Sequence, residues 1–237
     1  MNENAYSTTL MDFPDNDIFI ITESVYEKGY RAHACAKEPI TVQWIREFAH
    51  KGVFYDIGAN VGSYSLIAAS LMSDENVVVA FEPVFFNFYR LNENILINRF
   101  SNKIIPLNIG LTNKNAIETV YLNNLDFGVT ARAGGDVKKN LFTKALCLTL
   151  DSIMQTGTLP FPEHIKIDVD GDELAVLEGG AETFSDSRLK SLMIEIDESD
   201  VEQSTKTHEI LINSGFKLYD KKQLMSRNLF NTLFIKE

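Results

Sequence analysis

Four of the six ionisable residues in the segment "HIKIDVDGDE" are spaced so that they could act together: Lys166, Asp168, Asp170 and Glu173. The apolar residues between them predict a strand, on which the first three side chains share one face. Burying a lysine and two carboxylates on a central strand is costly unless the groups are paired or functional. They could orient a hydroxyl group and accept its proton, or form a structural ion pair that braces the strand against the following helix.

A glycine-bounded turn is the second feature that could do chemistry. The stretch "VFYDIGANVGSYSLIAAS", residues 53–70, reads as an apolar strand, an acidic residue, a turn and the start of a helix. In open parallel sheets, ligands bind where the strands end and the topology switches. A turn at that place offers backbone N–H groups and a helix N-terminus. A dinucleotide and S-adenosylmethionine are the two candidate ligands.

The glycine spacing separates these two ligands. The dinucleotide fingerprint is G-x-G-x-x-G, in which the second glycine lets the chain approach the pyrophosphate. Asn60 stands at that second position here, and Gly62 follows two residues later. Asparagine tolerates a left-handed backbone, so the turn survives, but its side chain crowds the pyrophosphate path. An NAD(P)-dependent oxidoreductase is therefore the alternative enzyme and not the favoured one.

S-adenosylmethionine lacks a pyrophosphate and suits the turn better. The backbone N–H groups from Gly58 to Gly62 could bind its carboxylate, and Asp56 could hold its ammonium group or brace the turn. Glu82 ends the next strand in "AFEP", where a carboxylate can accept a hydrogen bond from each ribose hydroxyl. The alternative for Glu82 is a solvated strand end. We take S-adenosylmethionine as the expected cofactor.

Several motifs together resemble one family. "DIGANVGSYS", "AFEPVFFNFYRLNENILIN", "CLTLDSIM" and "HIKIDVDGDELAVLEGG" are similar to the FkbM family of S-adenosylmethionine-dependent methyltransferases, from about Glu38 to Glu195. The resemblance implies an α/β class I methyltransferase (Rossmann-like) fold: a seven-stranded, mainly parallel sheet with an antiparallel final strand and helices on both faces. It also implies O-methylation of a hydroxyl on a sugar, glycan or natural product. By position, the implied cofactor-binding residues are Asp56, Gly58, Asn60, Gly62, Glu82 and, where adenine is usually contacted, Asn108.

The chain departs from the family motif at one acidic position. The family commonly shows I-K-I-D-V-E-G-x-E, whereas Asp170 here replaces the first glutamate. The charge is kept but the reach is one methylene shorter, which weakens any role for Asp170. We therefore expect Asp168 to act as general base or to orient the acceptor hydroxyl. Lys166 would pair with Asp168 or stabilise oxyanion charge, and Glu173 would complete the polar set.

Further acidic residues raise the question of a metal. Glu195, Asp197 and Glu198 end the following strand, and with Asp168 they could bind a divalent cation. A solvated acidic loop explains them more simply, so no metal is expected. A non-catalytic subunit that only binds the cofactor is a further alternative, against which the intact Lys166, Asp168 and Glu173 set argues.

The bulk composition limits the partners. The 237 residues are 45% apolar and 23% charged, as in soluble globular proteins. A net charge of −11 without a large basic cluster argues against nucleic acid. No stretch approaches the ~20 apolar residues that span a bilayer, and the start of the chain does not resemble a signal peptide. We expect a cytoplasmic enzyme with a hydroxylated small-molecule or glycan acceptor; a homo-oligomer is left open.

The elements that must position these residues alternate along the chain. From Gly52 onward, strands and helices alternate, which predicts a mainly parallel sheet covered on both faces. The last two strands lack an intervening helix and should pair antiparallel. We divide the chain into a methyltransferase domain at 52–237 and an N-terminal strand and helix extension at 1–51 packed on it. A β insertion at about 112–148 carries a glycine-rich loop, which is either a lid or a surface loop.

Overall fold

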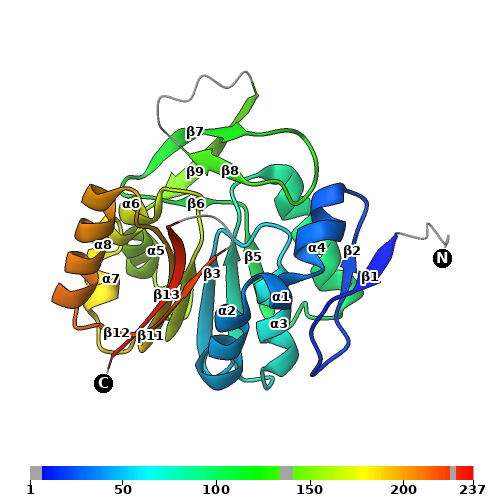
Figure 1. Cartoon of the computed structure of the whole chain (residues 1–237), viewed down its shortest axis with the longest axis horizontal. Coiled ribbons are helices and arrows are strands. Elements are labelled where there is room, and N and C mark those ends of the chain that lie inside the picture. The colour runs from blue at the N-terminus through cyan, green and yellow to red at the C-terminus, as the bar shows by residue number, and fades with distance from the viewer. Residues whose placement is uncertain (1–6, 134–140, 225–227, 237) are drawn as a thin grey trace.

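The centre of the molecule is a seven-stranded sheet, seen in the computed structural model of Figure 1, which describes residues 7–133, 141–224 and 228–236. The strand order is β12-β13-β11-β10-β3-β4-β5. Their bounds are Lys217–Gln223, Leu229–Ile235, Ser191–Asp197, His164–Ile167, Val53–Ile57, Val77–Phe81 and Ile104–Leu107. β13 runs antiparallel to both neighbours, and the remaining adjacent pairs are parallel. The predicted class I methyltransferase sheet is confirmed.

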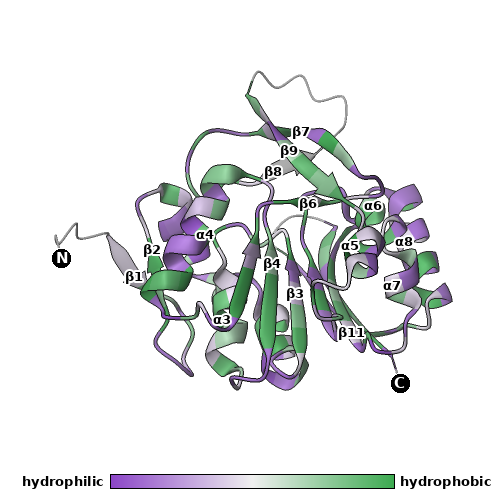
Figure 2. Cartoon of the chain, turned by 180° about the vertical axis from the view of Figure 1, so that it is seen from behind, coloured by the Kyte–Doolittle hydropathy of each residue, from purple (hydrophilic) through white to green (hydrophobic). Residues whose placement is uncertain are grey.

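Alternation along the strands divides the interior into two cores. On β3, Phe54 packs in one core, while Tyr55 and Ile57 pack in the other. Helices α3 (Ser63–Leu71) and α4 (Phe85–Ile97) cover the first core. Helices α5 (Leu150–Thr156), α6 (Glu173–Glu178), α7 (Ala181–Ser185) and α8 (Val201–Asn213) cover the second. In Figure 2, β4 is coloured as hydrophobic along most of its length, whereas helices α4 and α8 contain hydrophilic stretches. Helices therefore lie on both faces, as predicted.

The N-terminal segment lies on the same face as α3 and α4. It contains β1 (Thr8–Leu10), β2 (Phe19–Ile21), the helical turn η1 (Glu27–Arg31), α1 (Ala34–Lys37), α2 (Pro39–Trp44) and the helical turn η2 (Ile45–Ala49). The buried Arg90 of α4 holds it by ion pairs to Glu23 at 2.6 Å and Glu27 at 2.9 Å. Its guanidinium also lies 4.1 Å from the centre of the Phe127 ring. Removing one partner of such a buried pair is strongly destabilising, so Arg90 fixes η1 beside the sheet.

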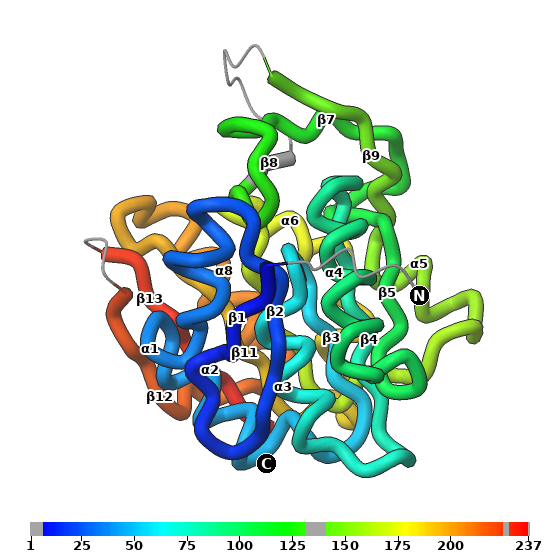
Figure 3. Tube along the Cα trace, turned by 90° about the vertical axis from the view of Figure 1, so that its right-hand side faces the viewer, coloured from blue at the N-terminus to red at the C-terminus, as the bar shows by residue number. Residues whose placement is uncertain are grey.

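A second, four-stranded sheet is formed around the insertion. Its order is β6-β9-β7-β8, with bounds Gly110–Leu111, Phe142–Leu148, Ala116–Leu122 and Ala131–Ala133. β7, β8 and β9 lie above the edge of the central sheet at which the parallel strands end (Figures 1 and 3). Of the glycine-rich loop "DFGVTARAGG", residues 126–135, only Gly134 and Gly135 fall outside the described residues. The insertion therefore borders the edge where ligands bind in such sheets.

The helical segment "DELAVLEGGAETF" is divided into α6 and α7 at Gly179 and Gly180. A Cβ on Gly179 would lie 2.0 Å from the Thr112 carbonyl oxygen, so the insertion backbone approaches too closely for another residue. The strand expected through Asp170 ends at Ile167, and Asp170 adopts a left-handed φ of 55° in the turn that follows. In the described part of the chain, no helix is long and apolar enough to cross a membrane.

Candidate active site

Two pockets meet at the ends of β3, β4 and β10. With the open solvent at their mouths included, the first has a volume of about 570 Å³ and the second of about 1180 Å³. Four residues line both pockets: Gly58, Asn60, Asp168 and Asp170. The turn after β3 and the turn after β10 therefore form the junction between the two spaces.

The turn after β3 is closed by hydrogen bonds within the protein. The N–H groups of Gly58 and Ala59 donate to the Phe81 carbonyl, and that of Gly62 donates to the Ala59 carbonyl. The Asn60 N–H donates to Glu82, and the Val61 N–H donates to the Asn60 side chain. Each of these N–H groups thus has a protein acceptor. The expectation that they bind a carboxylate is not supported by this arrangement.

Glycine is required at both ends of this turn. Gly58 has φ 85°, and a Cβ there would lie 1.9 Å from the Asp168 carbonyl oxygen. Gly62 has φ 93°, and its Cβ would lie 2.4 Å from Leu91 Cδ1 on α4. Left-handed φ values and close backbone approach both favour glycine. Gly58 lines the pockets, whereas Gly62 lies behind the turn, where it permits α3 to pack against α4.

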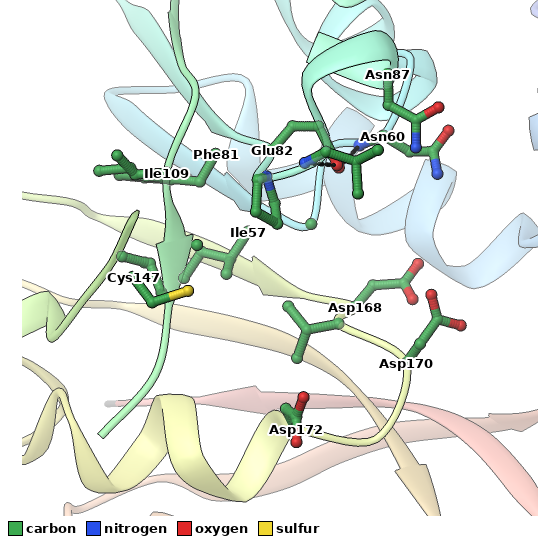
Figure 4. A pocket seen from close by; sticks show the side chains of 16 residues that line it. Ile57, Asn60, Phe81, Glu82, Asn87, Ile109, Cys147, Asp168, Asp170 and Asp172 are labelled. Atoms are coloured by element: carbon green, nitrogen blue, oxygen red, sulfur yellow. Dashed lines mark hydrogen bonds between the residues drawn. The ribbon is translucent and has the colours of Figure 1, made fainter. Parts of the chain in front are cut away.

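Glu82 is a buried carboxylate at the end of β4. One oxygen accepts a hydrogen bond from the Asn60 N–H at 2.8 Å, and the other accepts one from the Val84 N–H at 2.8 Å (Figure 4). Burial raises the pKa of Glu82 to about 7, even though these hydrogen bonds favour its charged form. Each carboxylate oxygen has a further lone pair. Glu82 is therefore held in place in the first pocket, where its carboxylate can accept two more hydrogen bonds.

Besides Gly62, two further predicted cofactor residues lie outside the pocket linings. Asp56 is buried under the turn, where it accepts a 2.6 Å hydrogen bond from Ser65, which fits bracing and not contact with an ammonium group. Asn108 is exposed, and its amide donates to the carbonyls of Glu82 at 2.8 Å and Pro83 at 3.2 Å. Ile109 and Gly110 line the first pocket in its place. Both predicted residues thus shape the site from behind.

The buried Lys166 forms an ion pair with the partly exposed Asp168. The Lys166 Nζ lies 2.8 Å from Asp168 Oδ2, and Lys166 is only 2% exposed. Burial alone would raise the pKa of Asp168, but the ammonium charge of Lys166 holds it well below its usual range. Lys166 lines neither pocket. Asp168 is therefore a fixed anion and a weak proton acceptor, which fits its predicted role in orientation better than its predicted role as a base.

Asp170 differs from Asp168 in its partners. Both side chains point toward Asn60 in Figure 4. Among the described residues, none donates a hydrogen bond to the Asp170 carboxylate or lies in ion-pair distance of it. Burial, and next the negative charge of Asp168, raise the pKa of Asp170 to about 7. Asp170, although one methylene shorter than the glutamate of the family motif, is thus better suited than Asp168 to accept a proton near neutral pH.

Glu173 and Glu195 lie on the far side of the β10 turn. One Glu173 oxygen accepts hydrogen bonds from the N–H groups of Val169 at 3.2 Å and Gly171 at 3.1 Å, so Glu173 holds the turn in shape. Glu195 lines the second pocket, and burial followed by the charge of Asp168 raises its pKa to about 9. Within the described ranges, no group of three or more histidine, cysteine or acidic residues could hold a metal ion.

The second pocket is lined by residues that the sequence did not single out. Arg31, His33 and Lys37 come from the N-terminal segment, and Leu224 and Leu229 come from the β12–β13 hairpin. Asn87 and Cys147, which lie within motifs quoted above but were given no role there, line the first pocket. Arg31, His33 and Lys37 belong to no motif, and only the folded chain brings them to the sheet edge. The N-terminal segment is therefore part of the site.

Side-chain hydrogen bonds hold the loop after β7 beside the second pocket. The side-chain amides of Asn60 and Asn87 both donate to the Val129 carbonyl at 3.0 Å. The guanidinium of Arg31 donates to the Gly128 carbonyl at 2.7 and 3.0 Å. The glycine-rich loop thus begins as an ordered wall that joins the N-terminal segment, the turn after β3 and α4.

Comparison with known proteins agrees with this arrangement. The sequence model described as the methyltransferase FkbM domain matches residues 56–218. The hexuronic acid methyltransferase AglP of Haloferax volcanii is 28% identical over 135 residues, 57% of this chain and 52% of that protein, so the matched region spans about half of that relative.

Solved structures share the fold. A methyltransferase FkbM from Methylobacillus flagellatus superposes with a TM-score of 0.53 at 15% identity, over 80% of this chain and 44% of that one. An O-methyltransferase from Bacillus cereus, solved in complex with SAH, superposes with a TM-score of 0.54 at 13% identity, over 86% of this chain and 82% of that one.

The first pocket fits the predicted cofactor. Phe81, Val84 and Ile109 give it apolar walls for a planar base, and the anchored carboxylate of Glu82 provides acceptors for hydroxyl groups. The acidic junction beside it suits a cationic sulfonium. The chain therefore belongs to the FkbM family of methyltransferases, with S-adenosylmethionine as its cofactor.

Proposed function

We propose that this chain transfers the methyl group of S-adenosylmethionine to a hydroxyl group of a sugar or a similarly hydroxylated molecule. The observation that carries this proposal is the position of Asp168 and Asp170 at the junction of two connected pockets. The first pocket suits the nucleoside of the cofactor. The second, about 1180 Å³, leaves room for an acceptor beside the junction.

The two aspartates have different roles toward the acceptor: Asp168 orients it and Asp170 accepts its proton. S-adenosylmethionine, when bound, supplies an electrophilic methyl carbon. Asp168, kept charged by Lys166, orients the acceptor by accepting a hydrogen bond from a neighbouring hydroxyl group of the sugar. Asp170, with a pKa near 7, accepts the proton as the oxygen attacks. Glu173 acts through the backbone by holding the turn that carries both side chains.

The pocket lining supports a polar acceptor. The second pocket combines three carboxylates, from Asp168, Asp170 and Glu195, with the cationic side chains of Arg31 and Lys37. Such a lining offers many hydrogen-bond partners for the hydroxyl groups of a sugar. The relative from Haloferax volcanii is named for hexuronic acid, which makes uronic acids the first acceptors to test.

The test is a methyl-transfer assay with a panel of free and uronic-acid-containing glycans. We expect a product whose new methyl group resists mild alkali, because an ether forms at a hydroxyl group. An alkali-labile methyl ester would show that a carboxylate is the acceptor and would contradict the proposed role of a proton-accepting aspartate. No transfer to any sugar, with transfer to another hydroxylated compound, would overturn the sugar assignment.

A further inference from the structure

The amino acid end of the cofactor needs a partner that the turn after β3 does not provide. S-adenosylmethionine carries a carboxylate and an ammonium group on its methionine portion. The N–H groups from Gly58 to Gly62 already donate to acceptors within the protein. A carboxylate that leaves water without compensating donors loses free energy. Its donor must therefore come from a different part of the pocket.

Arg31 is placed to be that donor. It lines the second pocket together with Gly58 and Asn60 of the turn. The hydroxyl of Ser63, the first residue of α3, donates to the Arg31 carbonyl at 3.0 Å. This hydrogen bond joins the backbone of the N-terminal segment to the residue directly after the turn. Arg31 thus lies where the methionine portion would extend from the nucleoside pocket.

Among the described residues, Arg31 forms no ion pair, although its charge acts on the carboxylates of Glu82, Asp168 and Asp170. Its Nε and Nη2 donate to the neutral carbonyl of Gly128, and within the described ranges no carboxylate lies within ion-pair distance of its guanidinium. Lys37, the other permanent cation in the same lining, is paired with the buried Glu38 at 2.7 Å. Arg31 therefore has both charge and donors left for a ligand, because a guanidinium carries five N–H donors.

The acidic groups of the pocket complement this cation. Asp168, Asp170 and Glu195 supply negative charge that suits an ammonium group, while Arg31 supplies positive charge that suits a carboxylate. We propose that Arg31 binds the carboxylate of the methionine portion of S-adenosylmethionine, so that the N-terminal segment completes the cofactor site. This inference rests on the cofactor assigned above.

Equilibrium binding tests the assignment without a methyl acceptor. Calorimetry with the full chain and its Arg31→Gln variant would compare three ligands: S-adenosylhomocysteine, its decarboxylated analogue with the amine retained, and 5′-methylthioadenosine. We expect the variant to bind S-adenosylhomocysteine about 10-fold to 100-fold more weakly, the usual effect of losing a hydrogen bond between charged groups. The two ligands without a carboxylate should keep their affinities. Arg31→Lys should recover part of the loss.

The three ligands separate a carboxylate contact from a general disturbance. An Arg31→Gln variant that loses affinity equally for all three would show that Arg31 only holds the loop at Gly128, and would overturn the assignment. Unchanged binding of all three would overturn it as well. Arg46→Gln, an exposed arginine of the same segment paired with Asp15, is the matched control and should bind like the unmodified chain. An unmodified chain that binds none of the three would instead refute the cofactor itself.

Discussion

The two pockets are built in different ways. The first is lined by successive strand ends of the central sheet, and its carboxylate, Glu82, accepts hydrogen bonds from two backbone N–H groups. The second draws its lining from the N-terminal segment, the insertion and the β12–β13 hairpin, and it contains Asp170 and Arg31, which form no ion pair among the described residues. Backbone hydrogen bonds thus fix the carboxylate of the first pocket, where we propose that the cofactor nucleoside binds, whereas the second pocket presents charged groups that could contact ligands.

The largest expected effect lies in the second pocket. Asp170→Asn should lower the rate of methyl transfer by about 10²-fold to 10⁴-fold, the usual contribution of a proton-accepting group. The affinity for S-adenosylhomocysteine should stay within a few-fold, because the amide keeps the shape of the turn. Single-turnover rates and calorimetry measure the two quantities. A rate close to that of the unmodified chain would remove Asp170 as the base.

The pH dependence distinguishes Asp170 from Asp168. Because the base must be ionised, the rate should rise as the pH passes through about 7, the pKa of Asp170. Asp168→Asn removes the neighbouring negative charge, so it should lower the pKa of Asp170 and move this rise to lower pH. Asp170→Asn should abolish the rise. Loss of the rise in the Asp168 variant alone would return the role of base to Asp168.

A smaller effect is expected in the first pocket. Glu82→Ala should weaken the binding of S-adenosylhomocysteine by about 10-fold to 100-fold, because a hydrogen bond to a charged group contributes about 1.5–3 kcal/mol. Glu75→Ala removes an exposed carboxylate just before β4 and is the control. If calorimetry finds equal affinities for S-adenosylhomocysteine in both variants, Glu82 only stabilises the turn after β3.

The smallest effect is expected behind the first pocket. Asn108→Ala removes hydrogen bonds to the Glu82 and Pro83 carbonyls, each worth about 0.5–1.5 kcal/mol. Thermal unfolding should therefore show a modest loss of stability, while the affinity for S-adenosylhomocysteine should not change. A tenfold loss of affinity would instead support the direct adenine contact predicted from the sequence.

The sequence predicts the first pocket better than the second, because the residues that form the turn of the first pocket are close together along the chain. The turn after β3 is specified by glycines and a strand that are neighbours in the chain, so its place at the sheet edge follows from the pattern. The sequence does not predict the turn after β10, because alternation continues in the letters "KIDVD" although the strand ends at Ile167 and Asp170 has a left-handed φ. A two-residue period cannot show where a strand stops.

Arg31 illustrates what no local pattern could supply. Its place in the pocket depends on Arg90 holding η1 against α4 and on Gly128, which lies 97 residues away along the chain. Those contacts form only when the N-terminal segment, α4 and the insertion come together. The fold class follows from alternation along the chain, whereas the charges around the acceptor follow from tertiary packing.

Calorimetric titration of the purified chain with S-adenosylhomocysteine and with NAD tests the central claim most directly, because it needs no knowledge of the acceptor. The two-pocket account predicts saturable 1:1 binding of S-adenosylhomocysteine, weakened by Glu82→Ala, and no binding of NAD, whose pyrophosphate would meet the Asn60 side chain. Binding of NAD in preference to S-adenosylhomocysteine would contradict the account. An affinity for S-adenosylhomocysteine that Glu82→Ala leaves unchanged would contradict it as well.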